Sequence, residues 1–251
     1  MNVSFRFPLE DNYFINEAFN SLSINLRFSG PDRKVITMTS CYENEGKSFT
    51  VLQLARHLCQ DGKKVIVVDA DMRKSQIVAK YTTLSGIKGL SELLSEMVTL
   101  DEVLYHVDNI PGMDIVFSGD YPPNPCVLLG NHRFDDLIAQ FREQYDYVLI
   151  DNAPLVPVVD AILCAKVSDG VVLIVNRGKV RQKVLRSICG QVEKSGAELI
   201  GVILNDNGKK KSPFGFRRKS KSRYGQYSYS YSYGRRNTDS GKSGKSGKSG
   251  K

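Results

Sequence analysis

The chain has 251 residues and a formal net charge of +8, but the charge is unevenly distributed. Residues 208–251 contain 14 Lys and Arg and a single acid, Asp239, so this segment carries +13 and residues 1–207 carry −5. The composition argues against a basic nucleic-acid-binding face on the main domain and confines the basic character to a C-terminal arm. The five cysteines are odd in number and lack Cys-x-x-Cys spacing, which argues against a disulfide framework or a zinc site and favours a reduced cytoplasm.

Apolar periodicity predicts an exposed helix within residues 14–27, and Gly30-Pro31 ends it. Strand-like apolar runs then recur between helical patterns. The predicted strands are 35–39, 65–69, 113–117, 147–151, 171–175 and 199–204, and the clearest helices are 48–60 and 181–194. Strands that are apolar throughout and alternate with helices predict an α/β fold, a mostly parallel sheet with helices on both faces.

The first predicted strand of this core runs into residues 40–48, Ser-Cys-Tyr-Glu-Asn-Glu-Gly-Lys-Ser, and a helix follows. A loop in this position presents backbone N–H groups and a helix N-terminus to phosphates. It also presents Lys47 to the β and γ oxygens of ATP and the Ser48 hydroxyl to Mg²⁺. The pattern is a Walker A loop with one departure, because Cys41 stands where the leading glycine is expected.

Carboxylates follow two of the predicted strands. The run 65–68 ends in Asp69-Ala70-Asp71-Met72-Arg73, and the run 147–150 ends in Asp151-Asn152-Ala153-Pro154. An acid at the carboxyl end of a buried parallel strand emerges beside the phosphate loop, where it can hold Mg²⁺ directly or through water. An acid in such a place is otherwise a turn residue or a helix cap, but two of them beside a phosphate loop favour a metal site.

These motifs together resemble the bacterial tyrosine kinases of capsule and exopolysaccharide biosynthesis, of the cytoplasmic type without a membrane span. The resemblance rests on the Gly-Lys-Ser loop, on Asp-x-Asp-x-Arg after the run 65–68, and on Asp-x-x-Pro after the run 148–150. Ser118-Gly119 with the segment 122–125, and the segment 201–205, also match, so the likeness covers roughly residues 12–207. It implies a P-loop NTPase of the deviant Walker group, to which MinD- and ParA-like proteins also belong.

The resemblance also implies roles for individual residues. The activity would be transfer of phosphate from ATP to protein tyrosines, with Lys47, Asp69, Asp71 and Asp151 as catalytic residues. The nucleotide would be held by Asn44, Glu45, Gly46, Lys47, Ser48, Phe49, Arg73 and Asn205. The Mg²⁺ ligands would be Ser48, Asp69 and Asp151. One of the aspartates at 69 and 71 would accept the proton of the incoming tyrosine.

The composition changes sharply after Asn207, where aliphatic side chains almost disappear. Such a segment is predicted to be disordered, because it buries too little apolar surface to offset its ordering entropy. Five tyrosines lie within ten residues of it: Tyr224, Tyr227, Tyr229, Tyr231 and Tyr233. Beside a kinase-like domain they favour an autophosphorylation cluster. The predicted organisation is therefore an N-terminal segment with an oligomerisation helix (1–33), a P-loop ATP-binding kinase domain (34–207) and a basic tyrosine-rich tail (208–251).

The resemblance implies partners as well. These are a separate membrane-anchored activator or adaptor of the polysaccharide co-polymerase type, and a cognate tyrosine phosphatase. The longest apolar runs are too short to span a bilayer, so the expected location is the cytoplasm, at the inner face of the membrane through a partner. The family's ring-forming helix carries Glu-x-x-Arg-x-x-Arg, but this chain has Glu17, Asn20 and Ser23. Self-association through a degraded motif is therefore expected to be weak.

Three other functions remain open at this stage. A septum- or partition-type ATPase switch usually has a second lysine five residues before the Walker lysine, where this chain has Tyr42. A catalytically weak nucleotide-binding adaptor of a polysaccharide export complex is favoured by Glu43, which stands where the family commonly has proline and could repel phosphate, and by the two lost arginines of the helix motif. The intact Lys47, Asp69, Asp71 and Asp151 oppose it. A nucleic-acid-binding ATPase that uses the basic arm ranks last, because no base-reading or stacking domain is visible.

Overall fold

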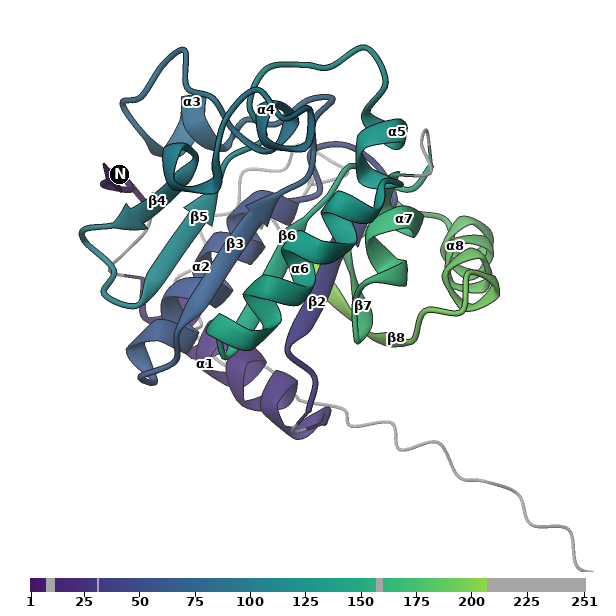
Figure 1. Ribbon diagram of the computed structural model, residues 1–251. Coiled ribbons are helices and arrows are strands. Elements are labelled where there is room, and N and C mark those ends of the chain that lie inside the picture. The colour runs from purple at the N-terminus through teal and green to yellow at the C-terminus, as the bar shows by residue number, and fades with distance from the viewer. Residues whose placement is uncertain (8–11, 31, 157–159, 207–251) are drawn as a thin grey trace, which may run out of the picture. The chain divides into compact units, whose positions relative to one another are not determined.

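The computed structural model describes residues 1–7, 12–30, 32–156 and 160–206 (Figure 1). The chain divides into a compact unit Met1–Lys209 and a second unit Lys210–Lys251. The second unit lies outside the described residues. The predicted disordered tail and its five tyrosines lie there too.

An eight-stranded sheet organises the first unit, in the order β1-β4-β5-β3-β6-β2-β7-β8. The strands are β1 Asn2–Val3, β2 Val35–Ser40, β3 Val65–Asp69, β4 Leu104–Val107, β5 Met113–Val116, β6 Tyr147–Asp151, β7 Gly170–Asn176 and β8 Leu199–Asn205. Every neighbouring pair is parallel except β4 and β5. The four strands β2, β3, β6 and β7 are buried along their length except for one partly exposed end residue, which is why they read as continuous apolar runs.

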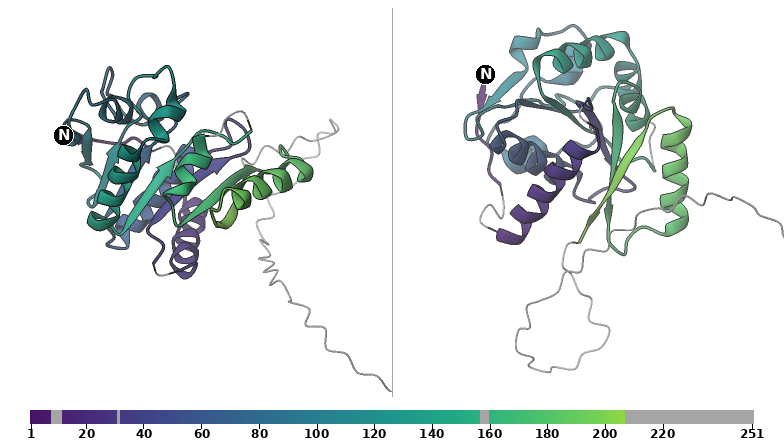
Figure 2. Two further views of the ribbon diagram at one scale, coloured as in Figure 1. Left: turned by 45° about the vertical axis from the view of Figure 1, so that its right-hand side comes forward. Right: turned by 90° about the horizontal axis from the view of Figure 1, so that it is seen from below.

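Helices cover both faces of this sheet (Figures 1 and 2). They are α1 Tyr13–Phe28, α2 Lys47–Gln60, α3 Ile77–Tyr81, α4 Leu90–Leu94, α5 Pro125–Leu129, α6 His132–Gln144, α7 Asp160–Lys166 and α8 Gln182–Lys194, with a 3₁₀ turn at Leu100–Glu102. The apolar side chains of α1, α2 and α3 pack on one face, and those of α4 to α8 pack on the other. The predicted mostly parallel α/β architecture is confirmed.

Three of the N-terminal seven residues, Val3, Phe5 and Phe7, belong to the core, which the sequence pattern does not indicate. The two-residue strand β1 pairs with β4, about a hundred positions away in the sequence. Phe5 and Phe7 are buried beside it, and the Phe5 ring meets Phe117 edge to face at 6.3 Å between centroids. Phe7 lies against Tyr81 at the end of α3. This segment therefore braces α3 from the sheet edge.

The predicted N-terminal helix is α1, and one of its faces is not exposed. Asn12 caps it by accepting hydrogen bonds from the backbone N–H groups of Phe14 and Ile15. Its inner face packs on α2, where the Phe19 ring stacks on His57 at 5.5 Å between centroids. Ser23 is 1% exposed, and its hydroxyl donates to Asp61 at 2.9 Å. Ser23 therefore faces the protein interior.

Candidate active site

The phosphate loop joins the end of β2 to the start of α2, and its backbone conformation depends on Gly46. This residue is the N-cap of α2 and has φ +91°, in the left-handed region that favours glycine. A Cβ atom at Gly46 would stand 2.3 Å from the amide nitrogen of Asn205. The position therefore excludes any side chain, both by conformation and by space. Cys41, in contrast, is fully buried in the apolar cluster under α7 and α8, and the backbone there needs no glycine.

Two polar side chains hold this loop against the sheet. The Glu45 carboxylate is fully buried and accepts hydrogen bonds from the backbone N–H of Tyr42 at 2.8 Å and of Asn176 at 3.0 Å. Asn205, the last residue of β8, donates from its amide to the Glu45 carbonyl at 2.9 Å. The Glu45 side chain therefore ties the loop to the end of β7. Only the backbone N–H of Glu45 remains to bind a phosphate.

A cavity of about 370 Å³ opens in front of the loop. It is lined by Glu43, Asn44, Gly46, Lys47, Ser48, Phe49, Asp71, Arg73, Lys74, Gln76, Lys80, Tyr81, Ala153 and Pro154. Seven of the residues predicted to bind nucleotide or catalyse are among them. Asp69, Asp151, Glu45 and Asn205 are not lining residues. The first two are buried at adjacent strand ends, and the other two lie behind the loop.

Asp151 is a buried carboxylate beside Lys47 and Ser48. It is 1% exposed, and neither of its oxygens has a hydrogen bond of normal geometry from the described residues. Burial raises the pKa of Asp151, while the Lys47 ammonium and the Ser48 hydroxyl act against that rise. An unpaired buried acid is costly, so such groups mark ligand sites. A hard divalent cation with oxygen ligands fits this position, beside the Ser48 hydroxyl.

Asp69 stands directly beside Asp151, because their strands pair in register. Its carboxylate accepts hydrogen bonds from the Ser75 hydroxyl and from the backbone N–H of Asp71. Burial, and then the charge of Asp151, raise the pKa of Asp69 well above its usual value. Asp71 is 7% exposed and lines the cavity; burial raises its pKa as well, and Lys47 lowers it. Three acids and one lysine thus converge where the sequence predicts them.

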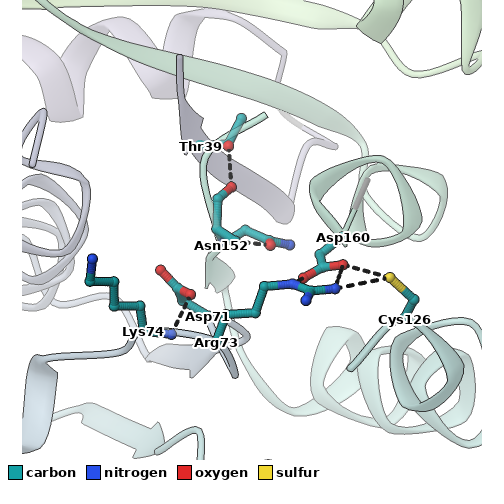
Figure 3. Close-up of polar contacts among 8 residues, drawn as sticks. Thr39, Asp71, Arg73, Lys74, Cys126, Asn152 and Asp160 are labelled. Carbon is teal, nitrogen blue, oxygen red and sulfur yellow. Dashed lines mark hydrogen bonds and ion pairs between the residues drawn. The ribbon is translucent and has the colours of Figure 1, made fainter. Parts of the chain in front are cut away.

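Arg73 also lines the cavity, and it is held by Asp160, a residue that no sequence motif marks (Figure 3). Its Nε and Nη2 atoms donate to the two carboxylate oxygens of Asp160, at 2.6 and 3.1 Å. Asp160 is fully buried at the start of α7. Cys126 on α5 completes the cluster: its thiol donates to Asp160 at 2.8 Å and its sulfur accepts from Arg73 Nη2 at 3.3 Å. Asp160 pairs across 87 residues, so no local pattern reveals it.

The segment that follows β6 is fixed by short hydrogen bonds, also drawn in Figure 3. The Thr39 hydroxyl on β2 donates to the carbonyl of Ala153 at 2.8 Å. The backbone N–H of Ala153 donates to the side-chain oxygen of Asn152 at 2.7 Å. These bonds hold the turn after Asp151 against β2, so that Ala153 and Pro154 form one wall of the cavity.

Glu43, the acid expected to repel phosphate, is paired with a lysine. Its carboxylate lies 2.6 Å from Lys74 Nζ, and both side chains line the cavity while remaining at least half exposed. The negative charge at this position is therefore accompanied by a positive charge at the same rim.

Most of the chain resembles known proteins. A family model described as an AAA domain matches residues 33–197. The chain is 38% identical to the tyrosine-protein kinase CpsD of Streptococcus agalactiae over 189 residues, which are 75% of this chain and 82% of that protein. It belongs to the bacterial tyrosine-protein kinase family. Within that family it is also 31% identical to YwqD of Bacillus subtilis over 214 residues, 84% of this chain and 86% of that protein.

Solved structures agree with this assignment. The kinase domain of the Escherichia coli tyrosine kinase ETK matches with a TM-score of 0.74 and 27% identity, over 81% of this chain and 80% of that chain. The chimerical protein CapA2B2 matches with a TM-score of 0.73 and 32% identity, over 78% and 86%. MinD from Pyrococcus horikoshii, at 21% identity and a TM-score of 0.57, shows the shared fold alone. The predicted family and enzyme class, protein-tyrosine kinase, are therefore confirmed.

Two further predictions are supported in their general form. The P-loop NTPase fold of this kinase implies nucleotide binding. Among the described residues, no helix combines the length and the hydrophobicity that a bilayer crossing requires.

Proposed function

We propose that the protein transfers the γ-phosphoryl group of Mg-ATP to tyrosine hydroxyls, that its own C-terminal tyrosines are among the acceptors, and that this reaction regulates capsular or extracellular polysaccharide synthesis and export. The observation that carries the proposal is the unpaired, buried Asp151 carboxylate beside Lys47 and Ser48. A carboxylate in that state is suited to hold a divalent metal ion, which would neutralise charge on nucleotide phosphates.

The residues divide the work between binding and proton transfer. Backbone N–H groups from Asn44 to Phe49 and the Lys47 ammonium would hold the phosphates. Asp151, Ser48 and Asp69 would hold Mg²⁺, which neutralises charge on the phosphate oxygens when it is bound. Asp71 would accept the tyrosine proton at a carboxylate oxygen. It is the better of the two candidate bases, because it lines the cavity whereas Asp69 is fully buried and bonded to Ser75.

Burial also suits Asp71 to this role. It raises the pKa of the carboxyl above its usual value, which brings the group closer to the working pH and makes it a stronger base. Arg73 and Asn205 would assist nucleotide binding: Arg73 lines the cavity, and Asn205 fixes the phosphate loop through the Glu45 carbonyl.

The acceptor assignment rests on the tyrosine cluster in the sequence, and the partner assignments rest on the family resemblance. The tyrosines at 224, 227, 229, 231 and 233 would be the modified residues, and a cognate phosphatase would reverse the reaction. A separate membrane-anchored activator of the polysaccharide co-polymerase type would bring the kinase to the inner face of the membrane. The alternative of a weak adaptor loses one of its supports, because Lys74 accompanies the charge of Glu43.

The test is direct. Purified full-length protein is incubated with Mg-ATP, with and without the cytoplasmic segment of the activator, and phosphotyrosine is mapped by mass spectrometry. The proposal expects modification within residues 224–233 that requires Mg²⁺. Nucleotide turnover without any phosphotyrosine would instead favour an ATPase switch.

A further inference from the structure

We infer that Asp160 is a positioning residue for this kinase: it fixes the Arg73 guanidinium so that the remaining edge of Arg73 presents its N–H groups to a phosphate of the nucleotide. The inference rests on the proposed function in that it takes the cavity for the nucleotide site. Asp160 belongs to no sequence motif, and its role in orienting Arg73 is visible only in the fold.

The first step is the geometry of the pair. Arg73 uses one edge of its guanidinium for Asp160: Nε donates to one carboxylate oxygen at 2.6 Å and Nη2 to the other at 3.1 Å. A bidentate contact fixes the plane of the guanidinium, whereas a single contact would let it rotate. The second hydrogen of Nη2 is directed to the Cys126 sulfur at 3.3 Å. The orientation of Arg73 is thus set by two partners on two different helices, α7 and α5.

The second step is what this arrangement leaves over. A guanidinium has five N–H groups, and the contacts to Asp160 and Cys126 use those of Nε and Nη2. Nη1 receives no hydrogen-bond partner from the described residues, and Arg73 lines the cavity together with Lys47 and Ser48. Two fixed N–H donors at the wall of a phosphate site are suited to a phosphoryl oxygen.

The third step concerns the rigidity of the support. Asp160 is fully buried, and the Cys126 thiol donates to the same oxygen that Arg73 Nη2 approaches. Both carboxylate oxygens of Asp160 therefore accept hydrogen bonds, which fixes the orientation of the carboxylate. The Arg73 side chain is 31% exposed, so without this clamp it would sample several rotamers in water. The clamp removes that freedom before the nucleotide arrives.

The test is a double-mutant cycle with Asp160→Asn and Arg73→Lys in the full chain. Asp160→Asn keeps the shape but removes the charge that orients Arg73, and Arg73→Lys keeps a cation for the buried acid but removes the fork. Each single variant is expected to weaken Mg-ATP binding about tenfold, since charge-assisted hydrogen bonds carry about that much affinity. The Mg-ATP affinity of the double variant is expected to lie within about twofold of that of the weaker-binding single variant, because both substitutions remove the same Arg73–Asp160 contact.

Two controls separate positioning from loss of structure. Adenosine lacks the phosphates, so its affinity should remain within about twofold of wild type in all three variants. The Arg142–Asp169 pair is a comparable ion pair, and neither residue lines the cavity, so Asp169→Asn should lower the melting temperature and leave Mg-ATP affinity unchanged. Cys126→Ser, which retains a donor for Asp160, should lose less Mg-ATP affinity than Cys126→Ala.

Three results would overturn the inference: Mg-ATP affinity within twofold of wild type in Asp160→Asn, an equal loss of adenosine affinity, or losses that multiply in the double variant. All of these are binding measurements. If the wild-type protein bound Mg-ATP but never modified tyrosine, the proposed function would fail while the cycle still decided the role of Asp160.

Discussion

Two buried carboxylates near the cavity differ in one respect, and the difference separates two roles. Asp160 is fully buried and both of its oxygens are hydrogen-bonded, by Arg73 and the Cys126 thiol. Asp151 is equally buried, yet neither oxygen has a hydrogen-bond partner of normal geometry among the described residues. Burial alone therefore does not identify a metal ligand. The informative property is whether the protein itself neutralises and hydrogen-bonds the buried charge.

The largest expected effect comes from Lys47, the cation beside Asp151 and Asp71. Lys47→Met should lower the rate of tyrosine phosphorylation by about 10²–10³-fold, as loss of a positioned charge donor does in other phosphate and oxyanion sites. Nucleotide affinity should fall by about 10- to 100-fold. Mass spectrometry of the full chain after incubation with Mg-ATP gives the first quantity, and a nucleotide titration gives the second.

A matched control for this change is Lys64→Met. Lys64 is an exposed lysine that precedes β3, whereas the site lies at the strand's carboxyl end. This variant should phosphorylate normally. Wild-type phosphorylation by Lys47→Met itself would show that the loop is not the ATP site.

One substitution at each acid tests whether Asp151 and Asp160 contribute to stability with opposite signs. Asp151→Asn removes a buried charge that lacks a hydrogen bond of normal geometry from the described residues, so the free energy of unfolding without ligand should rise by about 1–3 kcal/mol. Asp160→Asn leaves Arg73 without its counter-charge and should lower it by a similar amount. Thermal unfolding without nucleotide measures both, and a loss of stability in both variants would contradict the distinction.

Asp151→Asn, although expected to stabilise the fold, should be the more damaging of the two substitutions for activity. Asp151→Asn should abolish Mg²⁺-dependent phosphorylation, with little change in nucleotide affinity measured without Mg²⁺, because its proposed ligand is the metal rather than the phosphate. Retention of full activity would exclude it as a metal ligand.

The pH dependence of stability sharpens the same point. Burial raises the pKa values of Asp151 and Asp69 in the folded protein above their values in the unfolded chain. At a pH between the unfolded-state and the folded-state values, the folded protein therefore binds more protons than the unfolded chain. Stability without metal should therefore fall as pH rises from about 4 through the raised pKa values. The stability gain of Asp151→Asn over wild type should be near zero at pH 4 and largest above pH 7. Melting curves across this range test the sign, and a gain that is largest in acid would refute it.

The sequence carried the strand ends that build the site and missed the contacts that support it. The strands 65–69 and 147–151 coincide with β3 and β6, because buried parallel strands are continuously apolar and their terminal acids interrupt that run. The strands β1 and β4 were missed, since both are short and their pairing is set by partners distant in the sequence. Pattern reasoning sees periodicity within a segment but not which edge a two-residue strand will join.

The same limit applied to individual side chains. The family resemblance assigns Glu45 to the nucleotide with its neighbours in the loop, whereas the Glu45 carboxylate accepts hydrogen bonds from the backbone N–H groups of Tyr42 and Asn176. Asp160 was not recognised, because a buried acid is defined by a partner 87 residues away. The nucleotide-binding role of the Glu45 backbone, like the other site assignments, stays a prediction.

A stability effect of similar size is expected at Ser23, whose side chain joins α1 to the C-terminal end of α2. The family's ring-forming motif has arginines at the positions of Asn20 and Ser23, so the resemblance predicts that Asn20→Arg with Ser23→Arg strengthens self-association. Ser23 is buried and donates to Asp61, so Ser23→Arg should overpack the α1–α2 interface and destabilise the protein by about 1–3 kcal/mol. Asn20 is exposed, so Asn20→Arg should leave stability within about 0.5 kcal/mol of wild type.

Thermal unfolding compares these two variants, with light scattering to follow self-association of Asn20→Arg. A stable Ser23→Arg protein would mean that α1 separates readily from α2. In that case the helix would be available to a neighbouring copy on both faces.

The smallest effect is expected for Glu43, a cavity carboxylate that is exposed and ion-paired. Glu43 is half exposed and pairs with Lys74 at the cavity rim, and exposed ion pairs contribute about 0–1 kcal/mol. Glu43→Gln should therefore barely alter stability, while freeing Lys74 to approach a phosphate. Mg-ATP affinity should rise by no more than about threefold, and the rise should disappear at high salt, because exposed charges are screened beyond about 8 Å. A gain of more than tenfold would mean that Glu43 repels the nucleotide despite its partner, and a loss would mean that the pair itself shapes the site.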